Sequence, residues 1–287
     1  MKTYTSPLIK SCERKIYVDC PVCGKAPFYP FWGLKDCLYV RCQSCGLVYQ
    51  NPQPVFADLK KRYQAEYFAY ELQNEENFFK LMCLGLKDIG FTDDYFAHAS
   101  KKTFLDIGCA TGKLLAAMAE KGYSVQGVEI CADSALYGVT ERRVPIFIGQ
   151  LKEANFPDDF FYFVHFSHLI EHVPDPYQFL VEVNRILDPQ GFAIITTPNI
   201  ESLQANLFKT AWRSAIPDHL FLFSKRTLRA LLKKAGFEVL RIITWGGLAQ
   251  GAGPHWLKKP LDSMAKRLGF GDVMLMLARP LKGRADR

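Results

Sequence analysis

The sequence predicts an α/β protein built on a doubly wound, mainly parallel sheet and preceded by a small cysteine-rich unit. Short apolar runs alternate with helical patterns beyond residue 100, which is typical of a parallel sheet covered by helices. A glycine-punctuated turn joins one of these runs to a helix expected at residues 114–121. Two Cys-x-x-Cys-Gly motifs stand near the start of the chain, at residues 20–24 and 42–46.

The apolar pattern predicts the order of the elements. Leu59, Tyr63, Tyr67 and Tyr70 recur at helical spacing and predict one helix, and a second helix is expected at residues 75–89. Seven strands are expected at residues 103–107, 124–130, 145–148, 160–167, 192–197, 237–245 and 272–278.

The two cysteine motifs predict a metal site. They supply four thiols, from Cys20, Cys23, Cys42 and Cys45. Four thiolates form the tetrahedral cage that Zn²⁺ takes in structural sites, and the spacing falls in the range of a zinc ribbon. A structural disulfide pair or a redox-active Cys-x-x-Cys is the alternative. We expect the ribbon to occupy residues 1–54, with the break Asn51-Pro-Gln-Pro at its end, and the larger domain to occupy residues 55–287.

The glycine turn predicts a nucleoside site. Gly108, Ala110 and Gly112 place bare backbone at the carboxyl end of a strand, where α/β sheets bind cofactors. Glu129 ends the next strand and offers a carboxylate to a ribose. A dinucleotide fingerprint would need glycine at Ala110 and Lys113, so a pyrophosphate ligand is disfavoured.

The segment Phe104-Leu-Asp-Ile-Gly-Cys-Ala-Thr-Gly-Lys113 resembles motif I of the class I S-adenosylmethionine (SAM) methyltransferases, whose usual form is close to LDIGCGTG. Further similarity follows at residues 167–176, 187–199 and 212–237, so the resemblance covers most of the chain. The nearest similarity is to methyltransferases that carry an amino-terminal zinc ribbon and act on small metabolites, sugars or other glycan precursors. It implies a Rossmann-like, seven-stranded sheet and SAM as cofactor, with a structural Zn²⁺ in the ribbon.

The resemblance also implies roles for individual residues. Asp106, Gly108, Ala110 and Gly112 would contact the methionine moiety, and Glu129 would contact the ribose hydroxyls. Gln150 and Leu151 would contact the adenine ring, and Tyr67 would close over the cofactor. Cys109, Ile130 and Ser167 are also expected at the cofactor.

The acceptor side is expected to hold the catalytic base. His172 and His219 are the candidates, because histidine titrates near working pH, and Glu171 would orient one of them. Residues 199–223 are expected to form a lid over the acceptor. His168-Leu-Ile-Glu-His172 also reads as an inverted zinc-protease motif, but that motif needs a helix, and prolines follow here at once.

Charge and length set the remaining expectations. The net charge of +7 divides into +6 for residues 1–62, −4 for 63–252 and +5 for 253–287. The resemblance makes methyl transfer to an oxygen of a small molecule or sugar the leading function, and the mildly acidic central region argues against an RNA substrate. An RNA methyltransferase that uses its basic ends, or a non-catalytic ribbon protein with a degenerate fold, are the alternatives. No apolar run is long enough to span a bilayer and no signal peptide is evident, so we expect a cytoplasmic protein without membrane insertion.

Overall fold

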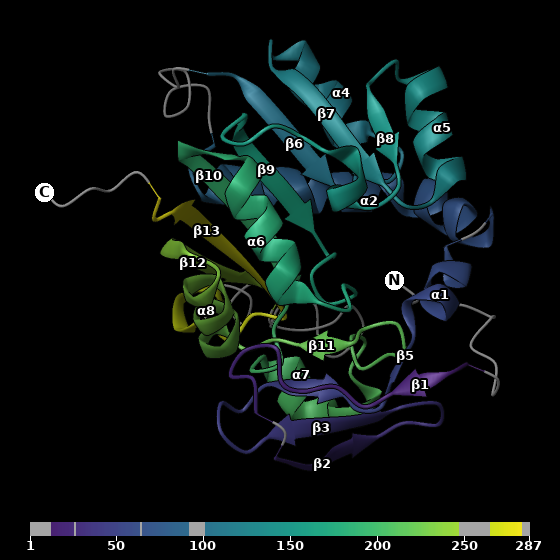
Figure 1. The fold of residues 1–287 in the computed structure, drawn as a ribbon, viewed down its shortest axis with the longest axis vertical. Coiled ribbons are helices and arrows are strands. Elements are labelled where there is room, and N and C mark those ends of the chain that lie inside the picture. The colour runs from purple at the N-terminus through teal and green to yellow at the C-terminus, as the bar shows by residue number, and fades with distance from the viewer. Residues whose placement is uncertain (1–12, 26, 64, 92–100, 247–264, 283–287) are drawn as a thin grey trace, which may run out of the picture.

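The computed structural model describes residues 13–25, 27–63, 65–91, 101–246 and 265–282, and a seven-stranded sheet forms the centre of the fold (Figure 1). Parts of both basic ends, residues 1–12, 253–264 and 283–287, lie outside the described residues. Across the sheet the strands are β12 (Phe237–Trp245), β13 (Val273–Pro280), β10 (Leu187–Pro198), β9 (Phe161–Ser167), β6 (Thr103–Ile107), β7 (Ser124–Glu129) and β8 (Ile146–Ile148).

The strands from β10 to β8 run parallel to one another, and β13 runs antiparallel to both β10 and β12. All seven strands lie where the apolar runs predicted them, so the α/β fold class is confirmed. The largest difference is at β10, which begins at Leu187 rather than at residue 192. Leu187 pairs with Phe161 of β9, and the register shifts before Phe192 pairs with Phe163.

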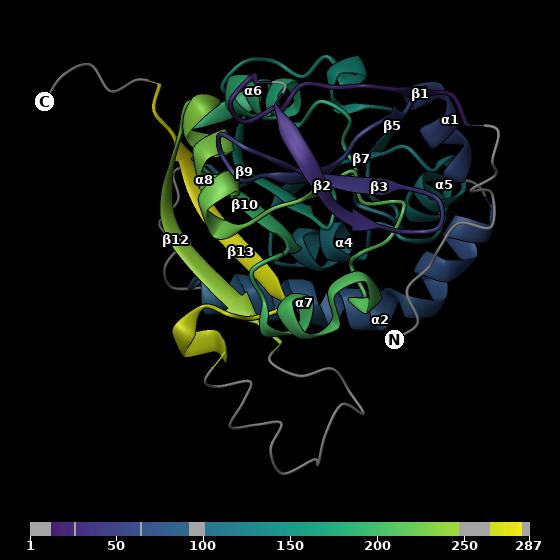
Figure 2. The same ribbon diagram turned by 90° about the horizontal axis from the view of Figure 1, so that it is seen from below.

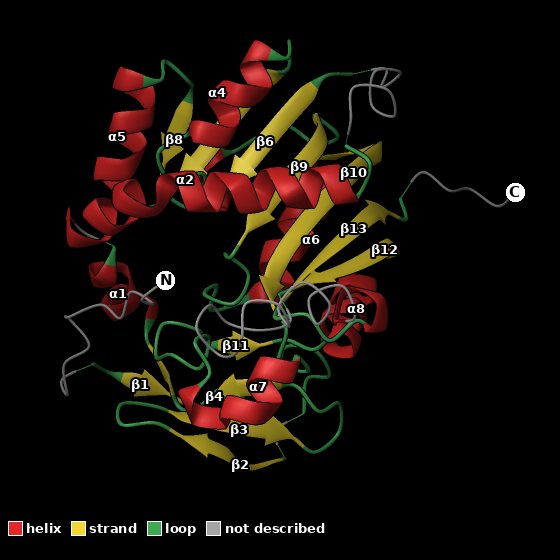
Figure 3. Cartoon of the chain, turned by 180° about the vertical axis from the view of Figure 1, so that it is seen from behind, coloured by secondary structure: helices red, strands yellow, loops and turns green. Residues whose placement is uncertain are grey.

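Helices cover both faces of the sheet (Figures 1 and 3). One face carries α2 (Ala65–Asp88), α4 (Lys113–Glu120) and α5 (Ala132–Glu141). The other carries α6 (Pro176–Ile186) and α8 (Lys225–Lys234). The shorter elements are α1 (Phe56–Leu59), α7 (Leu203–Phe208) and the 3₁₀ turns η1 (Lys60–Arg62), η2 (Leu151–Ala154) and η3 (Lys209–Ala211). Ser224 precedes α8 as its N-cap residue and forms a reciprocal capping box with Thr227.

The helices before the sheet differ from those expected. The pattern over residues 59–70 and the helix at 75–89 were predicted as two helices, but one continuous helix, α2, runs from Ala65 to Asp88. The break lies earlier, where Tyr63 leaves the helical region with φ −96° and ψ 72°. No proline or glycine stands between Tyr70 and Glu75, so nothing in that stretch ends the helix.

Residues 13–54, here called the amino-terminal unit, form a small antiparallel structure at the carboxyl ends of the parallel strands (Figures 1 and 2). Its strands are β1 (Lys15–Ile16), β2 (Phe28–Gly33), β3 (Leu38–Cys42), β4 (Val48–Gln50) and β5 (Gln53–Pro54). Strands β2, β3 and β4 are joined by a fourth, β11 (Phe221–Leu222), which comes from far along the chain. The small sheet is therefore completed by the large domain.

The expected break at residues 51–54 is an ordered part of the amino-terminal unit. The buried Asn51 side chain accepts from Val18 N at 3.0 Å and donates to Val18 O at 3.2 Å, and β5 pairs with β1. One hydrophobic cluster then includes Val40 and Leu47 of this unit together with Phe221 and Leu231 of the large domain. The two parts are joined by a shared core, and the domain boundary remains a prediction.

Candidate functional site

A cavity of about 270 Å³ lies at the carboxyl ends of β6, β7 and β9. It brings together residues that the sequence placed at the cofactor and one that it placed at the acceptor: Tyr67, Asp106, Gly108, Cys109, Ala110, Glu129, Ile130, Gln150, Leu151, Ser167 and His172. Three other expected residues, Gly112, Glu171 and His219, do not line it. The cavity therefore joins the predicted cofactor turn to the segment after β9.

The turn after β6 takes its shape from residues with positive φ. Gly108, Ala110 and Gly112 have φ of 70°, 49° and 73°. At Gly112 a Cβ would lie 2.8 Å from Val144 Cγ2, so the first helical turn of α4 packs too closely for any side chain. Ala110 adopts the left-handed region at a cost of roughly 1–2 kcal/mol, because its Cβ crowds the following carbonyl.

Glu129 is fixed by two backbone amides. Its Oε2 accepts from Ala110 N at 2.9 Å and its Oε1 from Cys131 N at 2.8 Å. Burial raises the pKa of the Glu129 carboxyl, and these amides act in the opposite direction. Each carboxylate oxygen has a further lone pair, so the side chain can also accept from a diol.

Asp106 is held by a histidine that sequence reasoning missed. His165 Nδ1, on the neighbouring strand β9, lies 2.7 Å from Asp106 Oδ1, and both side chains are buried. Strand register places the two residues opposite each other. Only the pairing of β6 with β9 reveals this contact.

A further wall of the cavity comes from α1, from the residue that follows η1, and from α2. It adds aromatic side chains, with Tyr63 and Tyr70 beside the expected Tyr67, and the carboxyl group of Glu71. Glu71 accepts from Ser134 Oγ. Burial, and then the charge of Glu129, raises the pKa of Glu71 to about 8. Sequence reasoning missed Glu71, although its spacing of four from Tyr67 placed both on one helix face.

The same helix is tied to the cofactor turn. Glu75 of α2 accepts from Thr111 Oγ1 of that turn and from Arg142 at the end of α5. Lys113 Nζ also lies 3.4 Å from Glu75 Oε2. These contacts hold α2 over the cavity.

The two expected base candidates lie side by side but in different surroundings. The rings of His172 and His219 are 4.7 Å apart between centroids and nearly perpendicular. His172 lines the cavity, and its Nδ1 donates to Asp218 O at 2.8 Å. His219 is buried, its Nδ1 donates to Ser214 O, and burial together with His172 lowers its pKa to about 3. This geometry favours His172 over His219 as the candidate base.

Glu171 is fully buried and does not line the cavity. Its Oε2 accepts from Thr197 Oγ1 at 2.9 Å, and its Oε1 lies 3.2 Å from His168 Nδ1. Although burial opposes ionisation, the neighbouring histidines, His168 first, lower the pKa of Glu171 to about 2. His168 itself lines the cavity with φ of 52°, and the sequence signal for it was the His-x-x-Glu-His motif.

The segment expected to be a lid is anchored at several points. Trp212 is buried and donates from Nε1 to Asp272 Oδ1 at 2.6 Å, and Arg213 pairs with the other oxygen of the same carboxylate. None of residues 199–223, all of which the structure describes, lines the cavity. The segment contacts a cavity-lining side chain at Asp218, whose backbone oxygen accepts from His172 Nδ1.

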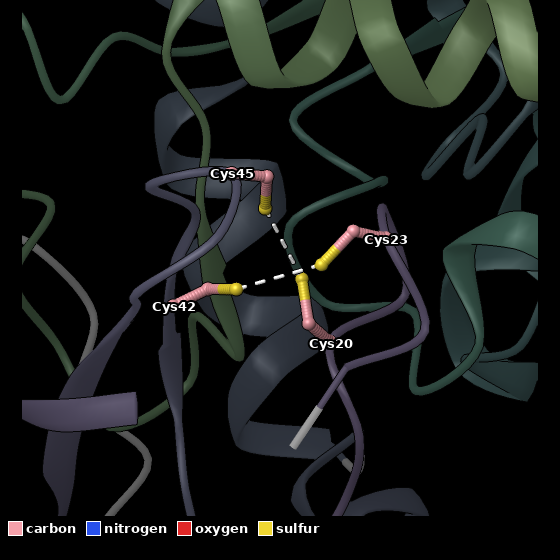
Figure 4. Close-up of side chains that lie close together, drawn as sticks. All are labelled: Cys20, Cys23, Cys42 and Cys45. Atoms are coloured by element: carbon pink, nitrogen blue, oxygen red, sulfur yellow. Dashed lines mark hydrogen bonds between the residues drawn. The ribbon is translucent and has the colours of Figure 1, made fainter. Parts of the chain in front are cut away.

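The four cysteines of the amino-terminal motifs converge (Figure 4). Their sulfur atoms all lie within 4.8 Å of one another, with Cys20 to Cys45 at 3.4 Å and Cys23 to Cys42 at 3.5 Å. A disulfide needs about 2.05 Å, whereas four thiolates around Zn²⁺ are about 3.8 Å apart, given Zn–S bonds of about 2.3 Å. The arrangement fits a tetrahedral metal site and excludes disulfides within this group.

The glycine after each second cysteine closes a tight turn. Gly24 and Gly46 have φ of 66° and 81°. Their amides donate to Cys20 O at 2.7 Å and to Cys42 O at 3.0 Å, which closes both turns.

A second group, Glu171, His172 and His219, also brings ligand atoms within 4.8 Å of one another. Here the Nδ1 atoms of both histidines already donate to carbonyl oxygens. Residues 168–175 form no helix, which agrees with the expectation that the inverted zinc-protease motif is not built.

A family model for a methyltransferase domain, Methyltransf_23, matches residues 76–242, more than half of the chain. The chain belongs to this methyltransferase family. It carries the domain of a SAM-dependent methyltransferase, with a Rossmann-like class I fold, and the matched residues include the cofactor turn, Glu129 and His172. Among the described residues, no helix is long and apolar enough to cross a membrane.

Relatives in sequence and structure agree with this class. The chain is 31% identical over 113 residues to ubiquinone biosynthesis O-methyltransferase of Pseudomonas paraeruginosa, covering 37% of this chain and 48% of that protein. It is 23% identical to demethylmenaquinone methyltransferase of Lysinibacillus sphaericus, over 55% of this chain and 81% of that protein. The chain thus spans about half the length of the ubiquinone enzyme.

Solved structures support the fold. A SAM-dependent methyltransferase from Archaeoglobus fulgidus superposes with a TM-score of 0.53 at 21% identity, covering 74% of this chain and 99% of that one. A possible histamine N-methyltransferase from Thermotoga maritima gives 0.54 at 20% identity, covering 74% and 98%. At these identities the likeness concerns the fold alone.

Proposed function

We propose that this enzyme transfers the methyl group of SAM to an oxygen atom of a small organic molecule, such as a metabolite or a sugar or glycan precursor. The single observation that carries this proposal is the continuous cavity. Both Glu129 with the cofactor turn and His172 line it. The names of the quinone-pathway relatives support a small-molecule acceptor.

The chain's own residues would divide the work of binding and proton transfer. Asp106 and the turn at Gly108 would hold the methionine part, Glu129 would accept from the ribose hydroxyls, and Gln150 and Leu151 would flank the adenine. Bound SAM supplies an already activated methyl group, so the protein's task is alignment, exclusion of water and removal of one proton.

His172 is the residue we assign to that proton. A carbonyl oxygen can only accept, so the contact with Asp218 O fixes the hydrogen of the neutral ring on Nδ1. Nε2 is then the ring's acceptor and can take the proton of an acceptor hydroxyl. His219, with its pKa lowered to about 3, is a much weaker base.

We further propose that the amino-terminal unit is a zinc ribbon. Cys20, Cys23, Cys42 and Cys45 would hold one Zn²⁺, and the sulfur separations support this. The metal would stabilise a unit that is too small to fold on its core alone, and it would take no part in the transfer.

Calorimetry with SAM or its demethylated product tests the cofactor site. Glu129→Ala should weaken binding about ten- to hundredfold, because a charge-assisted hydrogen bond contributes roughly 1.5–3 kcal/mol. Glu141→Ala, on an exposed position at the end of α5, is the matched control and should bind normally. Equal affinity of the Glu129 variant and wild type, with circular dichroism unchanged, would place the nucleoside elsewhere.

Turnover with an identified acceptor tests the base. His172→Asn should lower kcat by roughly 10²–10⁴ while leaving SAM affinity near normal. His219→Asn should have a smaller effect on kcat, and His168→Asn reports whether the second histidine of the cavity takes part. Full activity of His172→Asn would refute its role as the base.

A further inference from the structure

The loop at residues 216–219 accepts hydrogen bonds through its carbonyl groups from two sides, from residues 39–62 and from a residue that lines the cavity. The oxygens of Ile216, Pro217 and His219 accept hydrogen bonds from side chains of residues 39–62. The oxygen of Asp218 instead accepts from His172. One four-residue loop thus connects the two parts of the protein.

Two buried side chains make most of the contacts from the amino-terminal unit. The hydroxyl of Tyr39, on β3, lies 2.7 Å from Ile216 O and 2.6 Å from His219 O. Gln50 Nε2, on β4, donates to Pro217 O and to His219 O, both at 2.8 Å. Tyr39 is 0% and Gln50 1% exposed, so water does not compete for these carbonyls.

Arg62 holds the loop from a third direction. Its Nη1 contacts Asp218 Oδ1 at 2.7 Å and Pro217 O at 3.1 Å, and its other nitrogens pair with Glu13. The guanidinium is nearly buried and stays charged, because the two carboxylates compensate for its desolvation. A forked donor of this kind fixes direction as well as position.

The far side of the loop is bonded to the segment after β9. Leu220 N and Phe221 N donate to Glu171 O at 2.8 Å and 3.1 Å. His172 Nδ1 donates to Asp218 O at 2.8 Å. The main chain of Glu171 and the ring of His172 are therefore both fixed by a loop that the amino-terminal unit holds.

We propose that Tyr39 and Gln50 are positioning residues that fix the orientation and the proton-bearing nitrogen of His172 through the carbonyls of residues 216–219. The amino-terminal unit then has a second role besides its own stability: it sets the state of a side chain in the cavity of the other domain. The catalytic consequence rests on the proposed function of His172 as the base, whereas the positioning itself does not.

The test is nuclear magnetic resonance of ¹⁵N-labelled histidine, which distinguishes a hydrogen on Nδ1 from one on Nε2. The His172 signal is assigned by its loss in His172→Asn. Wild type should show the hydrogen of neutral His172 on Nδ1. In Tyr39→Phe combined with Gln50→Leu, the loop loses four contacts and His172 should shift to a population with the hydrogen mainly on Nε2.

Matched controls make the same chemical changes elsewhere. The controls are Tyr29→Phe and Gln43→Leu. Tyr29 lies on β2 and is 45% exposed, and Gln43 is also exposed. Both should leave the His172 signal unchanged. Metal content and SAM affinity should stay at wild-type values in every variant. Tyr39→Phe alone removes one oxygen from a buried ring, so it tests the contact even if the double variant does not fold.

Two outcomes separate the inference from the proposed function. An unchanged His172 tautomer in folded Tyr39→Phe and in the folded double variant would overturn the positioning role. A shifted tautomer together with full turnover of His172→Asn would leave that role standing and refute the base. If the positioning role and the role of His172 as the base both hold, kcat of the double variant should fall roughly ten- to hundredfold, with the Kd for SAM unchanged.

Discussion

The two sheets of this protein differ in where their strands come from. All strands of the large sheet lie between residues 103 and 280 of the same domain. The small sheet takes β2, β3 and β4 from the amino-terminal unit and β11 from beyond residue 220. In strand pairing the dependence therefore runs one way: the large sheet takes no strand from the amino-terminal unit, whereas the small sheet is incomplete without β11.

Metal removal should give the largest effect on this comparison. Structural Zn²⁺ contributes about 10–16 kcal/mol to the folding of small ribbons and fingers. We expect purified protein to hold one Zn²⁺, and a chelator to unfold residues 13–54 and release residues 216–222 while the large sheet stays folded. Metal analysis and hydrogen exchange resolved by segment measure this. An ordered amino-terminal unit with four reactive thiols and no metal would contradict it.

A matched pair of leucine truncations should show the same asymmetry with a smaller effect. Leu47 of the amino-terminal unit and Leu115 of α4 are both 0% exposed, and each truncation to alanine should cost about 2–5 kcal/mol. Leu115→Ala should lower hydrogen-exchange protection in both regions. Leu47→Ala should lower it only in the amino-terminal unit and in residues 216–222. Equal losses throughout the protein in both variants would show mutual dependence.

Through Glu71, a change of pH should act on the large domain. The carboxyl of Glu71 has its pKa raised from 4.5 to about 8, so between these values the folded protein keeps a proton that the unfolded chain has lost. Stability therefore falls as pH rises through this window. Glu71→Gln, which is always neutral, should flatten that decline when urea unfolding is measured at pH 5 and pH 8. An identical slope in wild type and variant would count against the raised pKa.

The smallest effect is expected at the cofactor turn. Ala110 has φ of 49°, where glycine is unstrained. Ala110→Gly should raise the free energy of unfolding by about 0.5–1 kcal/mol, because the relieved strain exceeds the entropy lost with the flexible unfolded chain. The midpoint of urea unfolding measures this, and Ala119→Gly within α4 is the control that should destabilise. A loss of stability in Ala110→Gly would show that the turn is not strained.

Features with a local cause could be predicted from the sequence. The strands follow from apolar runs, the cofactor turn from glycines that permit positive φ, and the metal cluster from cysteines three residues apart. Each pattern lies within a few residues of chain, so its physical constraint leaves a mark on the sequence.

Features that depend on packing could not be predicted. Glu71 reads as an ordinary helix carboxylate until α2 is placed against Glu129 and Ser134. The anchoring of Trp212 by Asp272 joins positions 60 residues apart. The contacts of Tyr39 and Gln50 are made to backbone oxygens, which every residue type carries, so no side chain in the loop reveals them.

The origin of β11 has a consequence for biosynthesis. β4 ends at Gln50 and its partner β11 begins at Phe221, 171 residues later. At about 5–20 residues per second, the ribosome needs roughly 9–34 s to make the intervening chain. During that time the outer edge of β4 has no partner strand and is open to pairing with other nascent chains. The small sheet of the amino-terminal unit therefore cannot be completed until residues 221–222 have been synthesised.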